Sequence, residues 1–307
     1  MKKAVAIYNP KSGLVKRVNQ NLKDTITKIF NEYDYDVQII ITEYKGHAEE
    51  IMPTLSDDID LVMSFGGDGT FNEIITGNVQ RKKMLPIAHI PSGTANDIGA
   101  MYGYTRNMQN NIRLALEGTK KEIDICTING APFVYVAGYG NYTTVSYETK
   151  RELKQYLGYL AYIFRAVKEV FKKQKLHHIT YEVNGEKYEG LFSLVLITNA
   201  TRVGGIDNIY DDVKLNDDKF EVLFCNLLKK RDILRTLVML GREKINNVPG
   251  LFFYKTNNIK LTITDPKAWT LDGEKFKLRT NRYEIKNTYK VPVQLPKKNI
   301  NKLFIQK

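Results

Sequence analysis

Several features are scarce in this chain of 307 residues, and each absence excludes a class of protein. Only two cysteines occur, Cys126 and Cys225, each inside an apolar run, so we expect no disulfide framework and a reducing environment. No stretch approaches the ~18 apolar residues of a membrane-spanning helix. The apolar run that follows Met1 is shorter than the roughly 7–15 residues of a secretory signal. The sequence therefore predicts a soluble intracellular protein.

Internal repeats, low-complexity tracts, zinc-ligand spacings and recognisable nucleic-acid-binding motifs are also absent from the sequence. The composition, with 43% hydrophobic and 26% charged residues, is that of an ordinary globular protein. At ~100–200 residues per domain, the length corresponds to about two domains. We expect one domain over residues 1–128, with the tail 292–307 packing back on it, and a second over residues 129–291.

Positive charge is concentrated in the second part of the chain. Residues 1–128 carry 15 basic and 16 acidic side chains, whereas residues 129–307 carry 31 and 18, and the net charge is +12. The excess is densest over Lys150–Lys175, where apolar residues recur at helical spacing, and a smaller basic helix is expected over Lys229–Lys244. Such helices are typical of contact with an anionic membrane surface. Alternatively, the apolar face of each helix can pack on the core of the protein itself, and the lysines can simply be solvated.

Strand and helix patterns alternate over the first 128 residues. Continuous apolar runs predict strands at 3–8, 37–41, 61–65 and 86–90, and periodic apolar residues predict helices at 14–30, 47–55 and 71–79. Continuous hydrophobicity fits a parallel sheet that is covered on both faces. The order predicts a doubly wound, Rossmann-like α/β domain with its ligand crevice at the carboxyl ends of the strands.

Short β-like runs dominate the chain after residue 128. The hairpin-type dipeptides Asn129-Gly130, Asn184-Gly185 and Asp272-Gly273 separate several of them. The predicted strands are 132–137, 179–183, 191–198, 220–224, 259–264, 275–278 and 282–285. This pattern predicts a mainly antiparallel β-sandwich that is interrupted by the two basic helices.

The segment Gly66-Gly67-Asp68-Gly69-Thr70 lies between a predicted strand and a predicted helix. Glycines let backbone N–H groups approach an anion, and a helix N-terminus adds oriented donors, which together form a phosphate cradle. We predict Thr70 as the N-cap, with Glu73 completing a capping box. An aspartate in such a cradle repels phosphate unless Mg²⁺ lies between the charges. The alternative of a plain glycine turn without a ligand would leave that aspartate unexplained. The P-loop class of phosphate site is excluded, because its sequence pattern is absent.

Two further polar loops follow predicted strands at the same edge of the sheet. Asn9-Pro10-Lys11-Ser12-Gly13 supplies a cation and a hydroxyl, and the segment 91–97 (PSGTAND) supplies hydroxyls, an amide and a carboxylate. Convergence of several loops at one strand edge is the geometry of an active site in an open α/β sheet.

Four motifs in this order resemble the bacterial soluble diacylglycerol kinases, which are related to sphingosine and ceramide kinases and, more remotely, to NAD kinases and phosphofructokinases. They are YNPKSG at 8–13, GGDGTFNE at 66–73, PSGTANDIG at 91–99 and LDGE at 271–274. The glycine motif alone identifies only the superfamily. The pairing of PSGTAND with a distant LDGE is specific to the lipid-kinase branch, and the resemblance spans nearly the whole chain.

The resemblance implies that ATP binds between the two domains. The implied nucleotide contacts are Asn9, Pro10, Lys11, Ser12, Gly13, Thr42, Gly66, Gly67, Asp68, Gly69, Thr70, Phe71, Asn72, Glu73 and Thr94. His47 stands where the family usually has aspartate. Glu274 is the implied general base for a lipid hydroxyl, with Asp68 as a second catalytic carboxylate. Without the other motifs, Glu274 would be interpreted as an exposed hairpin residue.

Metal sites are also implied by the resemblance. Asp68, Asp97 and Asp124 resemble carboxylates that organise Mg²⁺ and neighbouring ion pairs, although Asp124 is equally compatible with a satisfied buried carboxylate. The segment 213–220 resembles a structural Mg²⁺ loop. Asp217 would bind through its carboxylate, and Lys214 and Lys219 through their carbonyls, while Asp218 stands where glycine is usual.

The implied activity is transfer of the ATP γ-phosphate to diacylglycerol, giving phosphatidic acid. The enzyme would be cytoplasmic and peripherally bound to the anionic inner face of the membrane. Another lipid alcohol, such as a sphingoid base, remains open as the acceptor, as does a non-catalytic nucleotide-binding regulator. NAD kinase is disfavoured by PSGTAND and LDGE, and a nucleic-acid-binding protein by the glycine loops. A homodimer is left open.

Overall fold

The computed structural model describes residues 1–12, 20–140, 175–203, 206–207, 210, 212–227, 229, 231–232, 235–236, 239, 245–298 and 300–305. Gly13, most of the predicted basic helix 150–175 and much of 229–244 therefore lie outside the described residues. The chain forms two compact units, residues 1–123 with 289–307, and residues 124–288. None of the helices described is long and apolar enough to span a bilayer.

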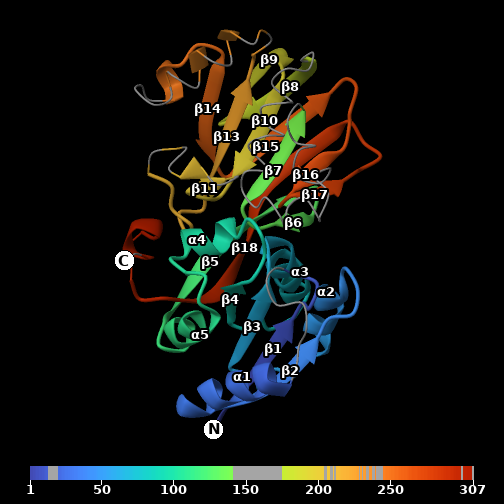
Figure 1. Ribbon diagram of the computed structural model, residues 1–307. Helices are drawn as coiled ribbons and strands as arrows, with labels where there is room; N and C mark the ends of the chain where they lie inside the picture. The colour runs from blue at the N-terminus through green and yellow to red at the C-terminus, as the bar shows by residue number, and fades with distance from the viewer. Residues whose placement is uncertain are drawn as a thin grey trace. The chain divides into compact units, whose positions relative to one another are not determined.

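The first unit is built on a parallel sheet in the order β2-β1-β3-β4 (Figure 1). Its strands are β1 (Lys2–Tyr8), β2 (Tyr35–Ile41), β3 (Leu61–Gly66) and β4 (Ile87–Pro91). The last part of β18 (Arg282–Leu295) extends the sheet beside β4, with Val293 opposite Ile87. Strand β3 is buried along its whole length. The doubly wound α/β prediction for this part of the chain is confirmed.

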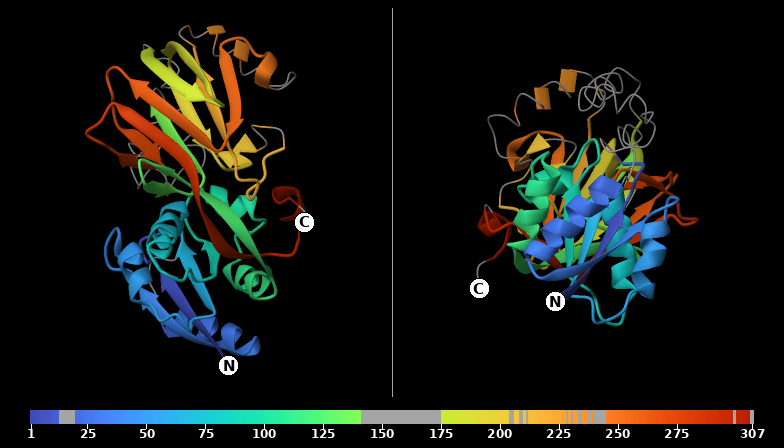
Figure 2. Two further views of the ribbon diagram at one scale, coloured as in Figure 1. Left: turned by 180° about the vertical axis from the view of Figure 1, so that it is seen from behind. Right: turned by 60° about the horizontal axis from the view of Figure 1, so that its bottom comes forward.

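Helices of the first unit form two groups, one with α1 against α5 and one with α3 against α2 and α4. These elements are α1 (Gln20–Glu32), α2 (His47–Ile51), the 3-10 turn η1 (Met52–Thr54), α3 (Asp68–Val79), α4 (Asp97–Met101), α5 (Met108–Leu116) and the 3-10 turn η3 (Ile300–Leu303). Helix α1 contacts β2, α3 contacts β3 and α5 contacts β4. Figure 2 shows the same elements from two other directions.

Two antiparallel sheets make up the second unit, which confirms the predicted fold class. One contains the first part of β18 followed by β15 (Asn258–Ile263), β8 (His177–Val183) and β9 (Glu186–Phe192). The other has the order β14 (Leu251–Thr256), β13 (Phe220–Cys225), β10 (Leu194–Thr198), β7 (Val136–Gly140), β16 (Trp269–Leu271) and β17 (Glu274–Phe276). One buried cluster joins residues of both sheets, including the fully buried Trp269.

Smaller elements complete this unit. Strands β5 (Thr119–Ile128) and β6 (Ala131–Phe133) form a hairpin, β11 (Arg202–Val203) pairs with β12 (Ile206–Asp207), and η2 covers Ile245–Asn247. The unit boundaries fall within β5 and β18.

Hairpin turns lie where their sequence chemistry predicted them. Asn129-Gly130, Asn184-Gly185 and Asp272-Gly273 all have positive φ at both positions, and they join β5 to β6, β8 to β9 and β16 to β17. Positive φ at both central residues is the signature of the type I′ hairpin turn. By contrast, the single strand predicted over 191–198 is two strands that meet at Ser193, and β14 and β16 were not predicted.

Candidate functional site

Three polar loops that follow β1, β3 and β4 come together in the first unit, as the sequence predicts for strand ends of a parallel sheet. The Asn9 side-chain amide donates to Thr70 Oγ1 at 2.9 Å. The hydroxyl oxygens of Ser12 and Ser92 lie 3.1 Å apart, and the Ser92 N–H donates to the Gly66 carbonyl at 2.7 Å. These contacts join the three loops into one polar surface.

Glycines allow the loops to approach this closely. A methyl group at Gly93 would lie 2.6 Å from Gly67 Cα, and one at Gly66 would lie 2.4 Å from Thr70 Cβ. Both distances are shorter than side chains tolerate, so these positions require glycine for packing. Gly69 differs, because a methyl group there would meet nothing within 4 Å. The side of the first turn of α3 on which Gly69 lies is therefore open, as a phosphate cradle requires.

Helix α3 begins earlier than predicted. Its N-cap is Gly67, whose carbonyl accepts from the N–H groups of Thr70 at 3.0 Å and Phe71 at 3.2 Å. The predicted capping box is wrong, because Thr70 already lies in the first turn and its hydroxyl is held by Asn9. The Glu73 carboxylate instead accepts from the Gly46 N–H at 3.0 Å, and burial raises its pKa.

Asp68 connects two loops of the site. Its carboxylate is buried and accepts from the backbone N–H groups of Asp97 at 3.0 Å and Ile98 at 3.1 Å. Asn96, in the left-handed region at φ 54°, closes the same loop by bonding both the N–H and the carbonyl of Gly93. These structural contacts of Asp68 and Asn96 were not predicted, because they join backbone groups to a distant side chain.

The loop after β2 borders this site. Thr42 is buried and donates its N–H to the Tyr8 carbonyl at 2.9 Å. The Lys11 ammonium donates to the Glu43 carbonyl at 2.9 Å, and Thr94 is exposed. The described residues predicted to contact the nucleotide thus lie on four loops of the first unit and the first turns of α3. Their individual roles in nucleotide binding remain predictions.

In the second unit, Asp124 holds the predicted structural Mg²⁺ loop through two hydrogen bonds. Asp124 accepts from the Asp218 N–H at 2.7 Å and donates its own N–H to the Leu215 carbonyl at 2.7 Å. Asp218 has φ 61°, a left-handed conformation that glycine adopts without strain and aspartate tolerates. Asp218 therefore keeps a backbone conformation that the expected glycine would also adopt.

Asp217 is already paired with a cation from the protein. The Lys255 ammonium lies 2.8 Å from Asp217 Oδ2, donates to the Asp212 carbonyl at 3.0 Å, and is 3.6 Å from Glu221 Oε1. Asp217 Oδ1 accepts from the Lys219 N–H at 3.1 Å. The loop oxygens suit a hard cation such as Mg²⁺, but Lys255 neutralises the carboxylate without one. Elsewhere too, no three acidic, histidine or cysteine side chains among the described residues are grouped to hold a metal.

The hairpin that carries Glu274 is fastened by Asp272. The Asp272 carboxylate is buried and accepts from three backbone N–H groups, those of Val134 at 2.6 Å, Tyr135 at 3.0 Å and Val136 at 2.9 Å. Glu274 begins β17 opposite Leu271 and has an exposed side chain. Its role as a general base remains a prediction.

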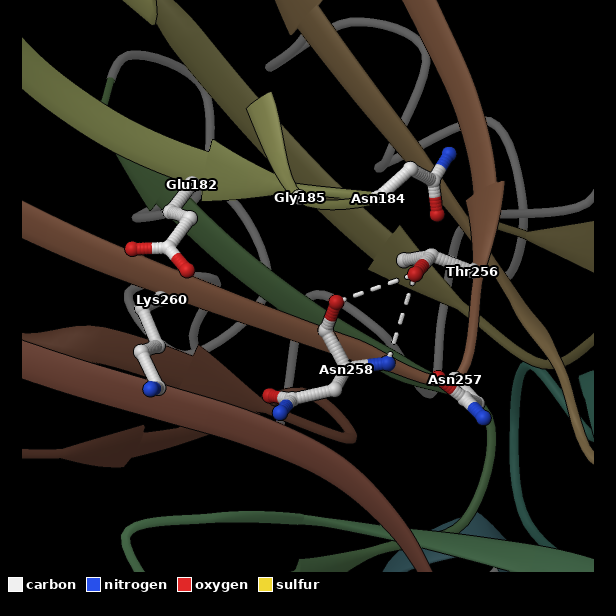
Figure 3. Close-up of a pocket in the computed structure, with 7 residues that line it drawn as sticks. All are labelled: Glu182, Asn184, Gly185, Thr256, Asn257, Asn258 and Lys260. Carbon is white, nitrogen blue, oxygen red and sulfur yellow. Dashed lines mark hydrogen bonds between the residues drawn. The ribbon is translucent and has the colours of Figure 1, made fainter. Parts of the chain in front are cut away.

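A polar hollow elsewhere in this unit contains none of the predicted site residues (Figure 3).

Comparison with known proteins connects these features to one family. Residues 3–128 match the family model of the diacylglycerol kinase catalytic domain. The chain is 29% identical over 276 residues to a diacylglycerol kinase of Bacillus subtilis (strain 168), covering 89% of this chain and 90% of the relative. A diacylglycerol kinase of Staphylococcus saprophyticus is 28% identical over 276 residues, covering 89% of both chains.

Solved structures show the same fold. The crystal structure of a diacylglycerol kinase from Bacillus anthracis str. Sterne aligns with a TM-score of 0.75 at 22% identity, covering 96% of this chain and 97% of that one. A second structure from the same organism aligns with a TM-score of 0.79 at 24% identity and the same coverage. At these identities the likeness concerns the fold, and it extends over both units.

Proposed function

We propose that this chain, which is similar to diacylglycerol kinases, transfers the γ-phosphate of ATP to the primary hydroxyl of diacylglycerol, forming phosphatidic acid. The observation that carries the proposal is the convergence of three loops around Gly66–Thr70 within the part of the chain that matches the kinase model. A non-catalytic nucleotide-binding regulator would share that cradle, and the experiment below separates the two.

The ATP phosphates would bind over the first turn of α3. The open space at Gly69 admits a phosphate, and the first N–H groups of a helix have no partner within the helix. Lys11 supplies a positive charge from the neighbouring loop. Mg²⁺ bound to the phosphates would offset their repulsion by Asp68 and Asp97, and it would need only one or two carboxylates besides the phosphates.

Glu274 would accept the proton of the lipid hydroxyl. As the hydroxyl oxygen bonds to the γ-phosphorus, the bond from that phosphorus to the β–γ bridging oxygen breaks and ADP leaves. Phosphoryl transfer depends mainly on positioning and on charge neutralisation, which the cradle and Lys11 would supply. Asp272 would position the Glu274 hairpin through its three backbone hydrogen bonds.

A transfer assay tests the proposed reaction. The pure protein is incubated with labelled ATP, Mg²⁺ and mixed micelles that contain diacylglycerol, a sphingoid base or a polyprenol. We expect label in phosphatidic acid. Label in another lipid would keep the kinase and change the acceptor, whereas nucleotide binding without transfer to any lipid would favour the regulator.

The role of Glu274 is tested by Glu274→Gln, with Lys275→Gln on the same strand as the matched control. Loss of a general base lowers turnover by about 10²–10⁴-fold, and the exposed position predicts an unchanged unfolding temperature. Lys275→Gln should keep normal turnover. Near-normal phosphorylation by Glu274→Gln would remove this residue from the mechanism.

A further inference from the structure

Tyr44 is an exposed aromatic residue that the proposed phosphate cradle leaves unexplained. Its side chain is 49% exposed, and no other aromatic side chain described in the first unit is classed as exposed. An aromatic ring of this size normally loses contact with water during folding. The position of Tyr44 in the loop after β2, between Thr42 and His47, suggests a ligand as its partner.

The exposed ring is held in one orientation. It stacks on the His47 ring with a centroid distance of 4.6 Å and an interplanar angle of 8°. The Tyr44 hydroxyl donates to Glu50 Oε2 at 2.6 Å, and His47 Nδ1 accepts from the Glu43 N–H at 3.1 Å. One face of the Tyr44 ring is therefore packed against His47, and its hydroxyl is held by Glu50. Such an arrangement has already lost the side-chain freedom that ligand binding would otherwise remove.

Contacts on both sides fasten this loop to the proposed phosphate cradle. The Lys11 ammonium donates to the Glu43 carbonyl at 2.9 Å, from the loop after β1. The Gly46 N–H donates to the Glu73 carboxylate at 3.0 Å, from helix α3. Tyr44 lies between these two anchor points in the chain. A ligand whose phosphates occupy the cradle would therefore lie beside the loop that carries Tyr44.

We propose that the stacked pair of Tyr44 and His47 is a platform for the purine base of the nucleotide, an inference that rests on the proposed ATP-dependent function. A purine is flat and aromatic, and it stacks on an aromatic side chain irrespective of its hydrogen-bonding groups. A neutral ring would contribute little to binding the phosphates themselves. The platform thus recognises the flatness of a base rather than its identity, so ADP and GDP should bind with similar affinity.

Calorimetric titration separates the base from the phosphates. ADP and inorganic tripolyphosphate are titrated into wild type, Tyr44→Ala, Tyr44→Phe and the control Tyr33→Ala, whose hydroxyl contacts Glu117. Tyr44→Ala should weaken ADP binding about tenfold, which corresponds to about 1.4 kcal/mol, and leave tripolyphosphate binding unchanged. Tyr44→Phe and Tyr33→Ala should bind ADP as wild type does.

Each other outcome has a defined meaning. Equal ADP affinity of wild type and Tyr44→Ala would overturn the platform and leave the proposed kinase function intact. Equal weakening of ADP and tripolyphosphate would show that Tyr44 only shapes the loop, which also overturns the platform. If wild type binds neither ADP nor ATP, the proposed function itself fails. Circular dichroism of each variant verifies that it is folded.

Discussion

At the scale of single residues, burial of His89 makes stability depend on pH. The side chain is 1% exposed on β4, its Nδ1 lies 3.4 Å from Ser64 Oγ, and its ring packs 4.7 Å from that of Phe71. Burial lowers the pKa of His89 to about 3. Since an unfolded histidine titrates near ~6.5, the unfolded chain binds a proton below that pH that the folded chain does not. The free energy of unfolding therefore carries no penalty from His89 above pH ~6.5, and it falls as the pH drops toward 3.

His89→Leu tests this dependence. Between pH 6.5 and 5, protonation of His89 in the unfolded chain should remove about 2 kcal/mol of stability from wild type, and the variant should lack that loss. Urea unfolding at pH 7.5 and pH 5 measures the difference. His178→Leu, at an exposed position on β8, is the control and should keep the acid sensitivity of wild type. Equal acid sensitivity in wild type and His89→Leu would contradict the prediction.

Asp272 is the second residue whose burial predicts a measurable effect. Asp272→Ala leaves three backbone N–H groups without their acceptor and places alanine at φ 46°, so we expect a loss of about 3 kcal/mol. Asp272→Asn keeps one carbonyl oxygen and tolerates the left-handed backbone, so its loss should be about half as large. Denaturant unfolding of both variants provides the comparison. Wild-type stability in Asp272→Ala would show that the three bonds contribute nothing.

At the scale of elements, the turn between β3 and α3 has two kinds of glycine. A side chain at Gly93 would collide with the Gly67 backbone, whereas a side chain at Gly69 would enter open space. The first kind is required for packing the loops against each other. The second kind leaves room that the proposed phosphates would fill. The two roles predict different results for the same substitution.

Gly93→Ala should lower stability by about 1–3 kcal/mol, because the two turns must separate to admit the methyl group. Gly69→Ala should keep or raise stability, since alanine is favoured in a helix over glycine by about 1 kcal/mol, and yet weaken ADP binding. Thermal unfolding and calorimetry measure the two quantities on the same samples. Unchanged ADP affinity in Gly69→Ala would place the phosphates elsewhere.

At the scale of the whole molecule, the uneven charge of the chain predicts how it meets a membrane. Residues 129–307 carry 31 basic and 18 acidic side chains, and each basic residue near an anionic surface contributes ~1 kcal/mol of attraction. We expect this charge to draw the protein to an anionic membrane surface, where the proposed lipid substrate would lie. The basic segment 150–175, for which the sequence left membrane contact and packing on its own core both open, lies mostly outside the described residues.

Vesicle sedimentation tests the electrostatic attraction. Binding to vesicles with phosphatidylserine should fall as NaCl rises from ~50 to ~300 mM, because the screening length shortens. Vesicles of phosphatidylcholine alone are the control and should bind little protein at any salt concentration. Binding to anionic vesicles that does not change with salt would contradict this mode of docking.

Local chemistry in the sequence was sufficient to predict the fold class, the three hairpin turns and the meeting of polar loops at the strand ends. Asn184-Gly185 predicts its turn because its backbone preference acts within four residues, and a continuously apolar strand indicates burial on both faces wherever it lies. The four motifs were likewise sufficient to predict the similarity to diacylglycerol kinases. Their residue roles in catalysis and metal binding remain predictions.

Only the tertiary structure decided which distant groups satisfy the buried polar atoms. Asp68 bonds the backbone of Asp97 and Ile98, and Asp272 bonds backbone groups more than a hundred residues earlier in the chain. No spacing rule predicts such partners, because the hydrogen bonds form only after the chain has brought both groups out of water. The start of α3 at Asp68 also lies among such contacts: Asn9, after β1, bonds Thr70, and Gly67, after β3, approaches Gly93, after β4, so both contacts require the sheet to have formed.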